Sequence, residues 1–394
     1  MSIDTDFRQG QAWKILSGGG YYQPYRTFVD EMWVAYRNRS SDTTPGNPFV
    51  SHEFLSALLE TGCAAPASGW TPRFVLLERD GELAAAMPLF LKSQSYGEYV
   101  FDWAWADAYA RHGLAYYPKT LGAVPFTPVA GPRLLARDDR DRSALLAAAL
   151  ELARDTSSLH VLFAGERDMQ VMREHGMLER RSVQFHWRNE GYADFAEFLA
   201  RMPHARRKNI KQERRRMREA GVEFRRLRGP EIDAAHWEFF HRCYRNTYAA
   251  HGSSPYLSLR FFQRLGATLA DHLVLFVAER AARPIAAALC FEDGHSLYGR
   301  HWGALEHVPL LHFECCYYQP IEYAIERGLA TFEGGAQGEH KIFRGLLPVE
   351  TYSAHWIANP RFARAIGEHL ARESAGIERY VNELAEHGPF KKER

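Results

Sequence analysis

The chain has 394 residues, of which 46% are hydrophobic and 25% charged, and its formal net charge is +1. This composition excludes a disordered or collagen-like chain, and the small net charge disfavours a globally basic nucleic-acid binder. The length indicates two or three domains with sizeable cores. No apolar stretch is long enough to span a bilayer, the polar N-terminus lacks a signal-peptide core, and five cysteines without framework spacing indicate reduced thiols. We therefore expect a cytoplasmic protein without an integral membrane segment.

Two segments in the two halves of the chain resemble each other. Each has an apolar strand, a Glu-Arg pair, a turn and a second strand with three consecutive alanines: residues 74–90 (FVLLERDGELAAAMPLF) and 275–291 (LFVAERAARPIAAALCF). The turn of the second copy is expected to be one residue longer. A second matched pair, 150–165 and 321–335, combines the end of an amphipathic helix with a buried strand that ends in glycine. Any α/β protein supplies such units by chance, but two matched pairs in the same order favour a duplication.

The remaining elements repeat in the same order. Helices are predicted before the hairpins, at 24–37 and 51–61 in the first half and at 232–250 and 258–270 in the second, and strands close the halves at 183–188 and 351–357. The pattern predicts an α/β (α+β) fold of two tandem lobes, each a mixed, largely antiparallel sheet flanked by helices. The expected boundaries are 1–190 for the first lobe, 191–358 for the second and 359–394 for a C-terminal helix.

The first half carries an additional aromatic and proline-rich segment at 99–135. We interpret it as a long loop, which is either functional or a hydrophobic flap. Its aromatic side chains, together with Asp102 or Asp107, are predicted to hold a cationic or amide-rich acceptor.

A strongly basic helix is predicted at 204–220. Residues 201–228 contain twelve Lys or Arg and three Glu, with positive charges expected on all sides of the helix. A solvated helix is one interpretation, but like charges one turn apart repel and favour an anionic partner. We predict that a phosphate-bearing ligand binds at Arg207, Lys208, Lys211 and Arg215.

The most polar turn follows a short buried strand at 330–333. Gly334, Gly335 and Gly338 allow close approach of a ligand to the backbone. A carboxylate, an imidazole and cations follow, and side chains at the end of a buried strand commonly form ligand sites. The predicted site residues of this turn are Gln337, Glu339, His340, Lys341 and Arg344.

Acyl transfer to an amine suits these residue types. Glu339 or His340 can remove the amine proton, and Lys341 or Arg344 can hold a phosphate or offset charge on the carbonyl oxygen. Tyr298, on the preceding strand 297–302, is a candidate proton donor. His312 and Glu314 lack a third ligand at metal spacing, so no metal is predicted.

The same segments resemble Fem-type aminoacyltransferases, which belong to the GNAT-like acyltransferases. The resemblance rests on Leu297-Tyr298-Gly299, Ile325-Glu326-Arg327-Gly328, Phe332-Glu333-Gly334-Gly335 and the basic turn Lys341 to Gly345. The chain is more closely similar to the FemAB-like "peptidoglycan biosynthesis/recognition" family of predicted N-acyltransferases. That similarity is carried by Trp105-Ala106-Asp107-Ala108-Tyr109, residues 124–128 (VPFTP) and residues 335–341 (GAQGEHK), and it covers nearly the whole chain.

The resemblance implies an N-acyltransferase that moves an acyl or aminoacyl group to an amine, such as a cell-wall precursor or a small metabolite. The predicted substrate-binding residues are Trp105, Asp107, Tyr109, Gln337 and Arg344. Residues 305–311 (LEHVPLL) lack the glycines with which acetyl-CoA enzymes hold the pyrophosphate, and no long helical hairpin of tRNA-dependent enzymes is present. Acyl-CoA and aminoacyl-tRNA therefore both remain open as the phosphate-bearing donor. The alternatives are a non-catalytic protein that recognises a peptidoglycan precursor or another anionic ligand, and an aminoacyl-tRNA-dependent aminoacyltransferase.

Overall fold

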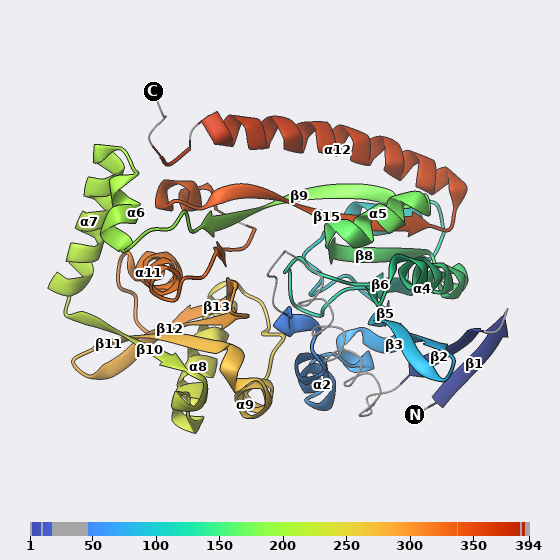
Figure 1. Cartoon of the computed structure of the whole chain (residues 1–394), viewed down its shortest axis with the longest axis horizontal. Coiled ribbons are helices and arrows are strands. Elements are labelled where there is room, and N and C mark those ends of the chain that lie inside the picture. Colours follow the sequence, from blue (N-terminus) through green and yellow to red (C-terminus); the bar gives the residue numbers. More distant parts are fainter. Residues whose placement is uncertain (1, 9–10, 18–45, 337, 387, 391–394) are drawn as a thin grey trace. The chain divides into compact units, whose positions relative to one another are not determined.

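A computed structural model describes residues 2–8, 11–17, 46–336, 338–386 and 388–390, with the backbone alone for 2–17, 339 and 385–386. The chain forms two compact units (Figure 1). The first contains β1 and β2 together with Phe49–Ser182 and Glu350–Glu378, and the second contains Val183–Val349 and the chain from Arg379. The predicted helix at 24–37 lies outside the described residues.

The first unit is built on a sheet in the order β1-β2-β3-β5-β6-β8-β15, and β4 pairs with β3 and β7. Its helix α4 packs against β3, β4 and β7. Its elements are β1 (Ser2–Arg8), β2 (Gln11–Ser17), α2 (His52–Glu60), β3 (Trp70–Arg79), β4 (Glu82–Met87), β5 (Leu89–Lys92), α3 (Trp103–Arg111), β6 (Lys119–Gly122), β7 (Leu135–Ala136), α4 (Asp139–Leu152), β8 (Ser158–Ala164), α5 (Glu166–Glu174), β15 (Leu347–Ile357) and the start of α12 (Pro360–Glu386).

The second unit is built on a sheet in the order β9-β14-β13-β12-β11-β10. Helix α8 packs against β12 and β13, and α11 contacts β13 and β14 (Figure 1). Its elements are β9 (Leu178–Arg188), α6 (Phe195–Ala200), α7 (His204–Glu219), β10 (Val222–Arg228), α8 (Ala234–Ala250), α9 (Leu259–Thr268), β11 (Leu273–Arg280), β12 (Arg283–Glu292), β13 (Ser296–Ala304), α10 (Leu311–Phe313), a π-helical turn (Glu314–Tyr318), α11 (Gln319–Glu326), β14 (Thr331–Glu333) and a 3₁₀ turn, η7 (Glu339–Arg344).

Local sequence accounts for many of the helix starts. A short polar side chain accepts a backbone N–H of the first turn at Ser51, Asp138, Asp194, Asp233 and Ser258. Of these helices, α4 and α8 pack on a sheet, whereas α9 packs on α8 and α6 contacts α11. No helix in the described part of the chain is both long and apolar enough to span a bilayer.

The two predicted hairpins are confirmed and match in detail. Strand pairs β3–β4 and β11–β12 each shift register at one position, between Leu77 and Glu78 in the first and between Ala278 and Glu279 in the second. These positions are equivalent in the sequence repeat. The expected longer second turn is wrong: both hairpins turn on two residues, Asp80-Gly81 and Ala281-Ala282, all at positive φ. Positive φ at both positions is typical of a type I′ turn, whose twist matches that of the strands.

The closing strands change the expected lobe boundaries of 1–190 and 191–358. Residues Tyr352–Ile357 of β15 pair antiparallel with β8 and belong to the first unit. Residues 186–188 of β9 pair with β14 and belong to the second. A strand joins the sheet edge with which it forms backbone hydrogen bonds, and local sequence does not specify that edge.

The segment 99–135 is not one long loop. It contains helix α3 and strand β6, and β7 begins at its end. Trp105 and Tyr109, one helical turn apart, bury one face of α3 against Ile366 and Leu370 of α12. The segment is therefore a folded part of the first unit.

Candidate functional site

Strands β13 and β14 run parallel for only three residue pairs. Their last pair is Tyr298 with Glu333, after which β13 continues along β12 to Ala304 and β14 ends. Farther along β13, where β14 no longer pairs with it, the carbonyls of Trp302 and Ala304 accept hydrogen bonds from side chains of α8. The strands therefore part where a tyrosine and a carboxylate stand side by side.

Glu333 is the most strongly perturbed carboxyl of this region. Burial, with the nearby charge of Asp293, raises its pKa to about 8, although 15% of its side chain is exposed. Its Oε2 has no hydrogen-bond partner among the described residues and lies 4.0 Å from His186 Nε2. Burial lowers the pKa of His186 to about 4, so this imidazole is neutral near pH 7 and does not form an ion pair.

Tyr298 is engaged by a neighbouring carboxylate. Its hydroxyl donates to Asp293 Oδ2 at 2.7 Å, and burial followed by the charge of Asp293 raises its pKa well above 10. The phenol is thus neutral and hydrogen-bonded. Its predicted role as a proton donor stays a prediction.

Lys341 lies on η7, close behind Glu333 along the chain. Its side chain is buried, and Nζ donates to the carbonyl of Gly335 at 3.1 Å. Burial lowers its pKa to about 8, and its charge contributes to the lowered pKa of His186. Gly335 has a φ of 78°, which a side chain would disfavour, and this conformation brings its carbonyl to the lysine.

His340 and Arg344 share η7 with Lys341 but have different partners. His340 Nε2 lies 3.2 Å from the hydroxyl of Tyr317, and burial, then the charges of Arg344 and Lys341, lower its pKa. Arg344 donates to both carboxylate oxygens of Glu213 at 3.0 Å and stacks on Phe313. Arg344 is therefore an anchor between η7 and α7.

The other residues predicted for the turn and for substrate binding lie as follows. Gln337 and the side chain of Glu339 lie outside the described residues. Trp105 and Tyr109 are buried in the α3–α12 cluster, and Asp107 is exposed and pairs with Arg111 at 3.2 Å. The structure thus brings together His340, Lys341 and Arg344, while Trp105, Asp107 and Tyr109 belong to the first unit.

The basic helix α7 is two-sided, which corrects the expectation of charge all round. Ile210 and Met217 are buried, and Arg214 donates to Glu314 and Glu322. Of the predicted anion-binding residues, Lys208, Lys211 and Arg215 are exposed and Arg207 is partly buried, and Arg215 pairs with Glu219. Anion binding by these four residues remains a prediction.

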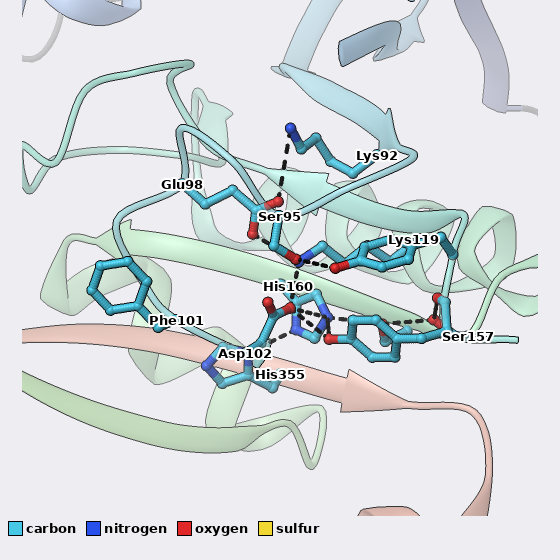
Figure 2. A network of polar contacts seen from close by, with 12 residues as sticks. Lys92, Ser95, Glu98, Phe101, Asp102, Lys119, Ser157, His160 and His355 are labelled. Carbon is cyan, nitrogen blue, oxygen red and sulfur yellow. Dashed lines mark hydrogen bonds and ion pairs between the residues drawn. The ribbon is translucent and has the colours of Figure 1, made fainter. Parts of the chain in front are cut away.

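The first unit contains a buried polar network that the sequence reasoning did not identify (Figure 2). Lys119 Nζ donates to Ser95 Oγ at 2.8 Å and Glu98 Oε2 at 2.7 Å, and it also pairs with Asp102. Lys92 Nζ lies 3.8 Å from Glu98 Oε1. Burial lowers the pKa of Lys92 to about 7 and raises that of Glu98 to about 7. For Asp102, burial is the largest single influence and acts in the opposite sense, but Lys119, through its charge and its hydrogen bond, together with His160 and Ser95 outweighs it and lowers the pKa to about 2.

The network continues through imidazoles on two strands. Tyr116 donates to Asp102 Oδ2 at 2.6 Å and lies 3.0 Å from His160 Nε2. His160 Nδ1 lies 2.8 Å from Nδ1 of His355 on β15 (Figure 2). Burial lowers both histidine pKa values, that of His160 to about 3, so both rings are neutral near pH 7. Among the described residues no group of three or more side chains is placed to hold a metal ion.

Both sets of missed residues carry a recognisable signal. Glu333 is a carboxylate at the last position of a buried strand, and Lys119, His160 and His355 are polar residues on buried strands. A buried polar group requires a partner, so such interruptions of an apolar pattern mark a site or a network. The pattern does not say which residues pair.

Comparisons with known proteins agree with this fold. A profile of the family described as peptidoglycan biosynthesis/recognition matches residues 26–392. No curated protein sequence matches significantly. Among solved structures, FemX is 13% identical with a TM-score of 0.54, covering 88% of this chain and 99% of that chain.

Two further solved structures have the same fold. The C-terminal domain of a putative lysylphosphatidylglycerol synthetase from Agrobacterium fabrum is 10% identical with a TM-score of 0.53, covering 88% of this chain and 96% of that chain. L-PGS from Bacillus licheniformis is 9% identical with a TM-score of 0.53, covering 91% of this chain and 98% of that chain. At these identities the likeness shows the fold alone, and it confirms the predicted mixed α/β architecture.

Proposed function

The chain belongs to the FemAB-like family, and from this premise we propose that it transfers an acyl or aminoacyl group from an activated donor to an amine. The observation that carries the proposal is Glu333, a carboxyl of raised pKa with a free oxygen at the point where β13 and β14 part. The description of the family, peptidoglycan biosynthesis/recognition, supports a reaction on a cell-wall precursor.

The chemistry requires a base and a positive charge. An alkylammonium must lose a proton before it attacks a carbonyl, and a carboxylate whose pKa is about 8 is a better base near neutral pH than an ordinary one. Lys341, when protonated, supplies the charge that stabilises the carbonyl oxygen or holds a phosphate of the donor. The acceptor is proposed to be a cell-wall precursor or small metabolite, and the donor acyl-CoA or aminoacyl-tRNA.

The proposed base and cation predict a particular pH dependence of kcat/KM. Glu333 must be ionised and Lys341 protonated, and both pKa values lie at about 8. The kcat/KM profile is therefore expected to be a narrow bell centred near pH 8, described by two apparent constants of the pair.

Transfer is tested by mass spectrometry of amine acceptors, including a muramoyl-peptide precursor, incubated with acetyl-CoA or charged tRNA. We expect the Glu333→Gln variant to lose at least about tenfold in kcat and the rising limb of the pH profile. Glu238→Gln, on the exposed side of α8, is the matched control. Precursor binding without transfer from either donor class would instead identify a recognition protein.

A further inference from the structure

Exposed aromatic side chains gather on one short segment of the first unit. Tyr96 is 57% exposed, Tyr99 38%, Phe101 61% and Trp103 42%. We call these four residues the aromatic platform. The rings of Tyr96 and Trp103 are in contact, with centroids 5.0 Å apart. Large exposed apolar groups within eight residues mark an interaction site more often than scattered ones do.

Buried anchors alternate with these exposed rings. Ser95, Glu98 and Asp102 are buried and all bind Lys119. Lys92 Nζ donates to the carbonyl of Tyr96 at 3.1 Å. The backbone that carries the platform is thus attached to the network of Figure 2 between successive rings.

The outer end of the segment is fixed in the same way. The carbonyl of Phe101 accepts a hydrogen bond from Arg180 Nη1 at 2.7 Å, and Arg180 is itself held by both carboxylate oxygens of Glu373 at 2.8 Å. Phe101 stands at the edge of the network with its ring directed away from the polar groups (Figure 2). A surface held in place before binding loses little conformational entropy when a ligand arrives.

The backbone at Tyr99 is strained. Its φ is 64°, in the left-handed region that a bulky residue rarely adopts. Such a conformation persists only where the surroundings enforce it, and here the buried anchors Glu98 and Asp102 lie on either side. The network therefore holds the platform in a geometry that the segment alone would not favour.

The chemistry of the segment favours a cation. Residues 93–110 contain Glu98, Asp102 and Asp107 but no Lys, Arg or His. Glu98 Oε1 and Asp102 Oδ1 accept no hydrogen bond from the described residues. Lys92 and Lys119 offset the two buried carboxylates, so the attraction comes chiefly from the negative ring faces. The same region already places an amino group over a ring, with Lys92 Nζ 3.6 Å from the centre of Trp70.

We propose that the aromatic platform binds an alkylammonium group of a ligand. As a recognition element for an amine-bearing substrate it rests on the proposed function, but its binding requires no acyl transfer. A neutral sugar and a lipid surface are the competing occupants. Unlike an ammonium ion, neither depends on a positive charge held over the ring faces.

The test compares choline with 3,3-dimethylbutan-1-ol, a neutral molecule of the same shape, by ligand-observed NMR on the whole protein. We expect choline to bind in the millimolar range and the alcohol at least about threefold more weakly, since each exposed cation–π contact changes affinity by a few fold. Trp103→Leu and Phe101→Leu should each weaken choline binding about threefold. Leu114→Ala, at an exposed apolar residue beyond α3, should leave it unchanged.

Equal binding of choline and the alcohol would overturn the proposal, as would choline binding that neither leucine variant weakens. Binding of N-acetylglucosamine or phosphatidylglycerol vesicles with no binding of choline would also overturn it. Glu333→Gln should bind choline like the unaltered protein. Loss of transfer with choline binding intact would thus refute the proposed function alone, and transfer without choline binding would refute the platform alone.

Discussion

Glu333 provides the sharpest test because its proposed role has a thermodynamic cost. Raising its pKa from 4.5 to about 8 means that the folded protein favours the protonated carboxyl. At ~1.36 kcal/mol per pH unit, a fully ionised Glu333 destabilises the fold by roughly 5 kcal/mol. Glu333→Gln keeps the shape of the side chain and removes this cost.

The sign of the effect follows from proton linkage. Below pH 4.5 Glu333 is protonated in the folded and unfolded chains, so the two proteins should be nearly equally stable. As the pH rises toward 8, the unfolded chain ionises while the folded chain holds its proton, and the unaltered protein loses stability relative to the variant. Above pH 8 the difference should level off at roughly 5 kcal/mol.

Urea denaturation at intervals from pH 5 to 9 measures this difference. The control is Glu238→Gln, which removes a carboxyl at an exposed residue of α8 in the same unit. If the Glu333→Gln difference were constant over this range, the carboxyl would not be desolvated and the base assigned to the reaction would be wrong.

Three further outcomes follow from the described contacts. Replacing Ala281-Ala282 by Asn-Gly should raise the free energy of unfolding by about 1 kcal/mol, since alanine is strained at positive φ. Gly81→Ala in the matching turn should lower the free energy of unfolding by a similar amount. Thermal denaturation of the two variants and the unaltered protein measures both changes. Replacing Lys208, Lys211 and Arg215 by Glu should abolish any salt-dependent binding of a phosphate-bearing donor, measured by titration at two ionic strengths. Arg214 is left unchanged in this variant because it pairs with Glu314 within the protein. Lys119→Met should destabilise the protein by about 3–5 kcal/mol in urea denaturation, because it removes the cationic partner of the buried Asp102 and one of the two lysine partners of Glu98. A loss below about 1 kcal/mol would show that water satisfies Asp102.

The local part of the fold could be predicted from the sequence. The hairpins, the helix α8 and the strand–helix–strand units follow from periodicities that neighbouring residues specify. The repeat even extended to the register shift beside Glu78 and Glu279. Helix α3 was missed because its aromatic content was interpreted as a loop, although its alternating alanines favour a helix and Trp105 and Tyr109 are spaced one turn apart.

The remaining features depend on partners far apart in the chain. His160 and His355 are 195 residues apart and meet because β15 pairs with β8. A single sequence shows that each is a polar residue in a buried strand, but the pairing of strands is set by whole-sheet packing. For the same reason Glu333 could be noticed only as the end of a strand, and its raised pKa required the surroundings that bury it.

The two repeats differ at the place where parallel strands meet, and the difference explains why the reactive centre is proposed in the second. The last parallel pair of β6 and β8 is Gly122 with Val161, where β13 and β14 have Tyr298 with Glu333. Beyond this pair, the backbone of Gly131 takes the place beside the end of β8. Gly131 N donates to Phe163 O, and Gly165 N donates to Gly131 O.

Arg133 then fixes this closing segment of the first unit. Its guanidinium donates to the carbonyls of Leu162 and Val129, and its backbone N–H donates to Asp168. The extra residues of the first half thus continue the sheet at the position where the strands of the second half part. With an apolar pair and a filled edge, the described part of the first repeat has no counterpart of Glu333 at this position, which favours recognition by its aromatic platform and chemistry at Glu333 of the second repeat.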